Sequence, residues 1–65
     1  MDRKEIGRRL RALRGKRTQQ EVAKALGITV QALSHWENGN RSPWDDMKVK
    51  VAQYYGVNVA DIFFS

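Results

Sequence analysis

Residues 19–38 read QQEVAKALGITVQALSHWEN, and this stretch decides the fold. Two short segments with helical spacing of their apolar residues meet at Gly27. Two helices that cross steeply through a short turn need a turn residue without a Cβ atom, and a small side chain where their backbones approach. Gly27 and Ala23 supply these features. The large inward residues are Val22, Leu26, Ile28, Leu33 and Trp36. The stretch therefore predicts two helices packed at a steep angle.

The second helix of this pair presents a polar, uncharged face opposite Leu33 and Trp36, at about 100° per residue. The residues of this face are Gln31, Ser34, His35 and Asn38, with Val30 at its margin. Such side chains read base edges in a major groove, above all an amide that pairs bidentately with adenine. Residues 19–38 thus meet the demands of a helix-turn-helix motif that contacts DNA. Plain solvent exposure of the same side chains is the alternative.

Capping signals predict further helices on both sides of the motif. Asp2 with Glu5 has the spacing of a capping box, and Gly15 ends the helix that it opens. Thr18 and Thr29 stand at the N-cap positions of the two helices of the motif.

The second half of the chain predicts two more helices. Pro43 fits the first turn of a helix that runs to about Tyr55, and Asn58 with Asp61 opens a short last helix. Little of the chain is typical of a strand. The sequence therefore predicts an all-α fold of five short helices, with one domain over residues 1–65.

Length and composition narrow the function classes. The 65 residues hold 12 Lys+Arg against 7 Asp+Glu, a net charge of +5, and no cysteine. The lack of cysteine excludes disulfides and thiol nucleophiles, and the single histidine, His35, makes a metal site unexpected. No nucleophile–base set and no phosphate-binding glycine loop is present, so we expect no enzyme activity, cofactor or small-molecule ligand. No apolar run approaches a membrane span.

The positive charge is concentrated at the front of the chain. Eight of the twelve basic residues precede residue 18; residues 1–44 carry ten basic and four acidic residues (+6), and residues 45–65 carry two and three (−1). This asymmetry suits a polyanion on one side of the molecule. An ordinary solvated surface is the alternative.

Segments along nearly the whole chain share one family pattern. They are Ile6-Gly7-x-Arg9-Leu10-Arg11-x-Leu13-Arg14, Thr18-Gln19-x-Glu21-Val22-Ala23, Leu26-Gly27-Ile28-Thr29, Trp36-Glu37-Asn38-Gly39, Pro43 and residues 52–63. In this order and at these spacings the chain resembles the phage-repressor/Cro-like helix-turn-helix family, also called the XRE family. Two features depart from the pattern: a turn before Thr18 about two residues shorter, and polar Asp45 and Lys48 in the fourth helix. We expect Trp44, Met47, Val51 and Tyr55 to pack that helix instead.

The resemblance implies a role for each matching position. The base-reading positions of the third helix are Val30, Gln31, Ser34 and His35. The phosphate-contacting positions are Gln19, Asn38, Asn40 and Arg41, with Lys16 and Arg17 in the shortened turn. Arg14 and Glu37 match a buried ion pair that joins the first helix to the third, a pairing that the position of Glu37 beside a basic helix also favours.

The C-terminal residues form a dense apolar tail. Exposed apolar patches on small domains often mark interfaces, so we predict a homodimer interface from Val57, Val59, Phe63 and Phe64. In the alternative, Ile62 and one phenylalanine close the core.

Together these features predict a cytoplasmic, sequence-specific regulator of transcription from a prokaryotic cell or a phage. It would act as a repressor that binds double-stranded DNA as a dimer on a two-fold operator. An antitoxin-like or accessory module that uses the same fold to bind another protein is the first alternative. A cationic membrane-surface peptide is the second, although the first helix has few bulky apolar residues and no aromatic ones.

Overall fold

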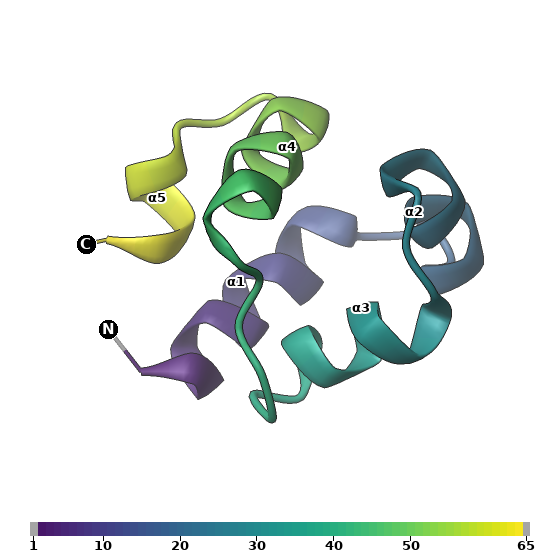
Figure 1. Cartoon of the computed structure of the whole chain (residues 1–65), viewed down its shortest axis with the longest axis horizontal. Coiled ribbons are helices and arrows are strands. Elements are labelled where there is room, and N and C mark those ends of the chain that lie inside the picture. The colour runs from purple at the N-terminus through teal and green to yellow at the C-terminus, as the bar shows by residue number, and fades with distance from the viewer. Residues whose placement is uncertain (1, 65) are drawn as a thin grey trace.

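The computed structural model describes residues 2–64, which form five helices joined by short turns (Figure 1). The helices are α1 (Arg3–Arg14), α2 (Gln19–Leu26), α3 (Val30–Glu37), α4 (Asp45–Tyr55) and α5 (Val59–Phe63). No strand occurs in this part of the chain. The prediction of a five-helix, all-α fold is confirmed. No helix within residues 2–64 has the length and hydropathy that a membrane crossing requires.

Side-chain caps start the first three helices where the sequence predicts them. Asp2, Thr18 and Thr29 each accept the backbone N–H three residues ahead, at 2.8, 3.0 and 3.1 Å. These bonds satisfy N–H groups that the first helical turn leaves unpaired. The capping box at α1 does not close, because the Glu5 carboxylate pairs with Arg8 and Arg9 instead.

The start of α4 differs from the prediction. The helix begins at Asp45, so buried Pro43 lies before it rather than in its first turn. Trp44 intervenes with extended backbone (φ −74°, ψ 169°), and its ring packs edge-on against Trp36 with centroids 6.3 Å apart. The carboxylates of Asp45 and Asp46 therefore occupy the first turn, where the helix dipole favours negative charge.

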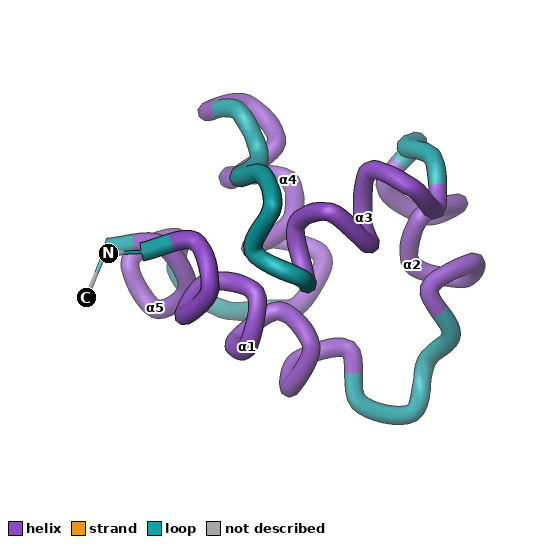
Figure 2. Tube along the Cα trace, turned by 90° about the horizontal axis from the view of Figure 1, so that it is seen from below, coloured by secondary structure: helices purple, strands orange, loops and turns teal. Residues whose placement is uncertain are grey.

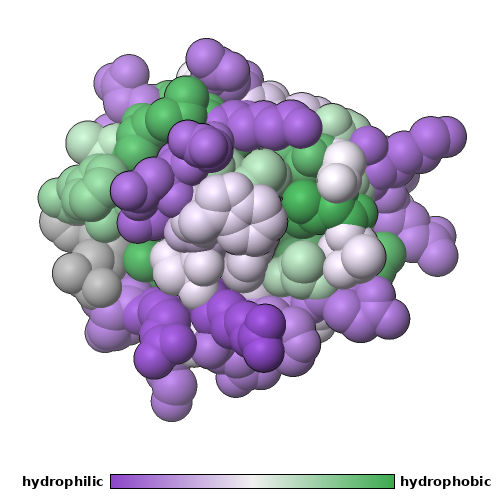
Figure 3. All heavy atoms as spheres, in the orientation of Figure 1, coloured by the Kyte–Doolittle hydropathy of each residue, from purple (hydrophilic) through white to green (hydrophobic). Residues whose placement is uncertain are grey.

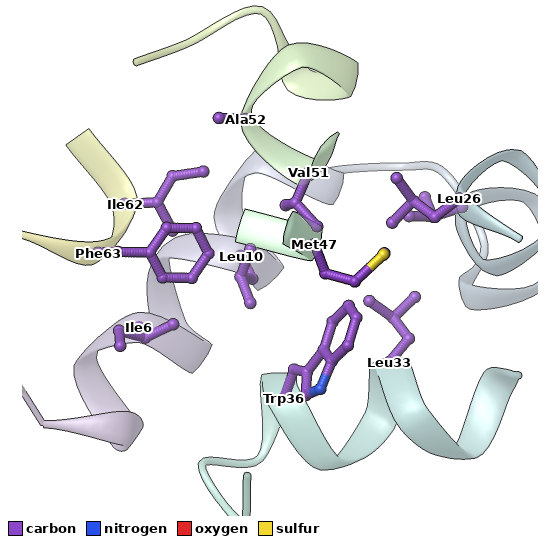
Figure 4. Close-up of a cluster of buried hydrophobic side chains, with 11 residues drawn as sticks. Ile6, Leu10, Leu26, Leu33, Trp36, Met47, Val51, Ala52, Ile62 and Phe63 are labelled. Carbon is purple, nitrogen blue, oxygen red and sulfur yellow. The ribbon is translucent and has the colours of Figure 1, made fainter. Parts of the chain in front are cut away.

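The hydrophobic core draws on all five helices (Figure 4). Its fully buried larger side chains are Leu10, Val22, Leu26, Leu33, Val51 and Ile62. Met47 from α4 lies over Trp36 and Leu33 from α3, and Phe63 lies beside Ile62 near Leu10. Met47 and Val51 pack α4 into the core as expected, and Tyr55 packs against it half-buried, whereas Trp44 lies before the helix, 61% exposed, with an edge-on contact to Trp36.

α1 and α3 cross with their backbones in near contact at Gly7. A Cβ atom on Gly7 would lie 2.3 Å from the carbonyl oxygen of Glu37 and 2.9 Å from that of Trp36. Any side chain there would therefore force the two helices apart. The crossing fixes the position of α3 against α1.

Candidate nucleic-acid interface

The predicted reading face of α3 lies on the side of the helix away from the core. Gln31 and His35 are exposed, while Val30 and Ser34 are half-buried. The Gln31 amide has no hydrogen-bond partner within residues 2–64. Ser34 Oγ accepts from Asn38 Nδ2 at 3.2 Å, and His35 Nδ1 lies 3.5 Å from Asn40 Nδ2. Of the four predicted base-reading residues, Gln31 therefore offers an uncommitted amide with donors and an acceptor.

The turn of the motif sets the angle of this face. Gly27 adopts a left-handed conformation (φ 71°), and its N–H bonds back to the carbonyl groups of Ala23 and Lys24. Thr29 then caps α3 three residues later. These local bonds start α3 directly after the turn, with Leu33 and Trp36 in the core and Gln31 outside.

The carboxylate of Glu37 is withdrawn from the surface. Glu37 is 3% exposed, and its Oε2 accepts from Arg14 Nε at 2.7 Å while Oε1 accepts from Arg14 Nη2 and Gln19 Nε2 at 3.0 Å each. The hydrogen bonds to Glu37 raise the pKa of Arg14. The ion pair that joins α1 to α3 is present in the structure. It leaves no free carboxylate on α3 to repel a polyanion.

The same network holds the side chain of Gln19 at the first position of α2. Its amide nitrogen donates one N–H to Glu37. An amide nitrogen carries two N–H groups, so a second one remains for a phosphate. Gln19 is half-buried.

The turn after α3 holds three more of the predicted phosphate-contacting residues. Asn38, Asn40 and Arg41 are exposed. The Asn38 side chain is held between Ser34 Oγ and Arg11 Nη2, the latter at 3.1 Å. The Arg41 guanidinium has no partner in the described part of the chain, which leaves all five of its donors available.

Arg17 is placed differently from Lys16, although both are exposed in the α1–α2 turn. The Arg17 guanidinium lies 5.3 and 5.6 Å from the ring centroids of Tyr54 and Tyr55 on α4. Burial raises the pKa of Tyr55 to about 12, and its hydroxyl has no partner within residues 2–64. Sequence reasoning missed this contact, which ties the shortened turn to α4.

The predicted dimer residues divide between core and surface. Phe63 is 4% exposed in the single chain, so the structure removes it from the predicted interface and places it in the core. Phe64 is 65% exposed, and Val57 and Val59 are half-buried against the core. The reason is the phase of α5, which turns Ile62 and Phe63 inward and leaves Phe64 at its C-cap.

Comparison with known proteins adds to this geometry. The helix-turn-helix family model matches residues 8–62. The chain belongs to the helix-turn-helix family. A protein of Methanocaldococcus jannaschii described as an uncharacterized HTH-type transcriptional regulator is 37% identical over 46 residues, which are 71% of this chain and 70% of that protein. The comparison with solved structures gives no match.

The family match confirms the resemblance stated from the sequence. The chain is a DNA-binding, helix-turn-helix transcriptional regulator of the Cro/C1 (XRE) type, a family whose members are typically not enzymes.

Gly7 is a structural residue whose role sequence reasoning missed, because it allows the close contact between the backbones of α1 and α3. A glycine inside a helix lowers the stability of the helix by roughly 0.5–1 kcal/mol relative to alanine. A glycine at such a position is therefore a sequence signal that another backbone lies close to the helix there.

Proposed function

We propose that this helix-turn-helix regulator binds double-stranded DNA sequence-specifically and represses transcription as a homodimer on a two-fold operator. The observation that carries the proposal is the exposed, carboxylate-free face of α3, with the Gln31 amide uncommitted. Residues 1–65 act as one DNA-binding domain in this proposal, and a regulator of this kind works in the cytoplasm.

Sequence is read by α3 in the major groove, which is wide enough to admit a helix. Gln31 is suited to a bidentate contact with adenine, and Val30 to the methyl group of thymine. Ser34 and His35 contact bases or sugars through single hydrogen bonds. Few of these are strong bidentate readers, so a large share of specificity comes from DNA shape and from the spacing of half-sites.

Affinity comes from contacts to phosphates. Hydrophilic side chains line the lower edge of the molecule, the side on which α3 lies (Figure 3). Gln19, Lys16, Asn38, Asn40 and Arg41 contribute contacts that hold the register of the helix on the duplex. Such contacts release counterions, so affinity falls as the salt concentration rises.

The dimer forms through the C-terminal surface, where Phe64 is 65% exposed beside half-buried Val57 and Val59. Figure 3 shows hydrophobic side chains gathered over α5 and the segment before it, at the upper left. Two reading helices related by a two-fold axis then meet half-sites about 34–36 Å apart. Repression follows because the bound dimer covers the promoter.

An antitoxin-like or accessory role is the second candidate, and exposed apolar residues just before and within α4 favour it. Trp44 is 61% and Val49 48% exposed, and the DNA contacts above use neither. A protein partner would bury them. Stable co-purification of one partner that competes with DNA would support this role over the first.

Selection from random duplexes tests the proposed function. The protein is incubated with a pool of random DNA at near-physiological salt, and the retained duplexes are sequenced. We expect enrichment of a two-fold symmetric motif. Retention without enrichment contradicts sequence-specific reading, and no retention contradicts DNA binding altogether.

A further inference from the structure

Basic side chains of α1 surround the turn that follows α3. Arg11 Nη2 donates to the carbonyl of Glu37 and to Asn38 Oδ1, each at 3.1 Å. Arg3 Nη1 donates to the carbonyl of Asn40 at 3.1 Å. Lys4 packs against Gly39 so closely that a Cβ there would lie 2.9 Å from Lys4 Cγ. Seen from the α3 side, α1 runs beside α3 (Figure 2).

The backbone of this turn has no N–H groups to offer a phosphate. The N–H groups of residues 38–41 already donate to the carbonyls of Ser34, Trp36 and His35, the last accepting two. The Asn38 amide nitrogen uses one of its two N–H groups on Ser34 Oγ. A phosphate beside the turn must therefore be held mainly by side-chain donors, and the cations of α1 are the nearest additional supply.

Arg11 is the best placed of these cations. Both of its hydrogen bonds within residues 2–64 use Nη2, so Nε and Nη1 keep three N–H donors without a partner there. The side chain is exposed, and its bonds to Glu37 and Asn38 hold the guanidinium in place. A pre-oriented, exposed guanidinium with free donors is suited to a phosphate oxygen.

We propose that Arg11, with Lys4 on the same flank, binds a phosphate of the DNA backbone next to the Asn38 turn, so that α1 extends the DNA interface beyond the helix-turn-helix motif. The inference rests on the proposed function and adds residues to it. The competing role is purely structural: Arg11 would cap the carbonyl end of α3 and touch no DNA.

Salt dependence separates these roles. Fluorescence anisotropy measures DNA binding between 50 and 200 mM NaCl for wild type, Arg11→Gln and Lys4→Gln. Each protein is tested on the duplex enriched by selection and on a random-sequence duplex. Loss of one phosphate contact lowers the salt slope by about 0.9, so the affinity loss of Arg11→Gln shrinks about 3.5-fold across this range. We expect the same change on both duplexes, because phosphates carry no sequence.

Lys50→Gln is the matched control. Lys50 is exposed on α4 with its Nζ near Gly27, and its loss changes the net charge equally. Its salt slope should equal that of wild type. Melting temperatures, followed by circular dichroism, show whether each variant is folded. If Arg11→Gln does not fold, Lys4→Gln still tests the proposal, because the Lys4 side chain makes no hydrogen bond to the turn within residues 2–64.

Neutral linkages locate the contact. In each of a set of duplexes, one phosphate is replaced by an uncharged methylphosphonate. At the linkage that Arg11 contacts, this replacement should lower the affinity of wild type but leave the affinity of Arg11→Gln unchanged. Unchanged salt slopes in folded Arg11→Gln and Lys4→Gln, with wild type still enriching a motif, would overturn this inference alone. Failure of wild type to enrich any motif would instead overturn the proposed function.

Discussion

The α1–α3 crossing and the α4–α5 end of the molecule are built in different ways. At the crossing, Gly7 lets the backbones meet, and the buried Glu37 carboxylate binds Arg14 and Gln19. At the other end, α4 and α5 pack through apolar side chains and leave Val49 and Phe64 exposed. α3 is thus held by close backbone contact and a buried ion pair, whereas the far end exposes apolar side chains.

This difference shows how one small domain can hold α3 in a fixed position and still expose apolar side chains elsewhere. Backbone contact and directional hydrogen bonds allow one geometry only. Side-chain packing at a helix of five residues allows some hydrophobic groups to face solvent. Substitutions should therefore act on stability at the crossing and, at exposed positions of α5, on association.

The two neighbouring phenylalanines give the largest contrast. Phe63→Ala should lower the free energy of unfolding by about 3–5 kcal/mol, because it removes a buried ring from the core. Phe64→Ala should change it by less than about 0.5 kcal/mol, because the ring is mostly exposed. Urea denaturation measures both values. Sedimentation of Phe64→Ala should show a folded monomer, and an unchanged dimer mass would remove Phe64 from the interface.

Two glycines test the crossing itself. Gly7→Ala should destabilise the fold by about 3 kcal/mol, since the new Cβ meets backbone atoms of α3. Gly56→Ala is the control: its Cβ meets nothing within 4 Å, and only the left-handed φ of 72° opposes it, at about 1–2 kcal/mol. Equal thermal stabilities for the two variants would contradict the claim of close backbone contact.

Removing the buried charge should have a smaller effect. Glu37→Gln keeps the shape of the side chain but leaves Arg14 without its anion, and we expect a loss of about 2 kcal/mol. That value is below the range for fully buried pairs because the Arg14 side chain is 19% exposed. Glu21→Gln, at an exposed position, should change the free energy of unfolding by less than about 0.5 kcal/mol. A similar loss in both variants would speak against a special role for Glu37.

Tyr55 gives the smallest effect at neutral pH and a distinct one at high pH. Tyr55→Phe removes a buried hydroxyl without a described partner, so stability at pH 7 should stay equal or rise by up to about 1 kcal/mol. The pKa of Tyr55 is raised from 10.0 to about 12, so the folded state holds its proton longer than the unfolded state. Wild-type stability should therefore fall as the pH rises from 10 to 12.

Melting temperatures of wild type and Tyr55→Phe across this pH range test the pKa shift. The variant should lose less stability than wild type between pH 10 and 12. Parallel curves would mean that Tyr55 titrates alike in the folded and unfolded chain.

The sequence predicts the helix-turn-helix stretch well because its signals are local. The Thr18 and Thr29 caps, Gly27 and the apolar phase of α3 each depend on residues within one or two turns. The partnership of Glu37 with Arg14 was also predictable, since a carboxylate on the inner flank of α3 needs a cation.

Features that depend on tertiary contact escape this reasoning. In a five-residue helix the sequence alone does not show which phenylalanine is buried, because the packing of α5 against α1 and α4 sets the phase of the helix. α4 begins two residues later than predicted, and the Trp44 ring before it contacts Trp36 of α3, eight residues earlier in the chain. The stacking of Arg17 on Tyr54 joins residues far apart in the chain. The bonds of Arg11 to the turn after α3 are of the same kind.

The most direct test of the account compares the DNA motifs selected by Gln31→Ala and Arg41→Ala with that of wild type. We predict that Gln31→Ala loses preference at one or two base pairs of each half-site, at about 1–3 kcal/mol. Arg41→Ala should select the wild-type motif with uniformly weaker, less salt-dependent binding. An unchanged motif for Gln31→Ala would contradict the assignment of the exposed face of α3 as the surface that reads DNA.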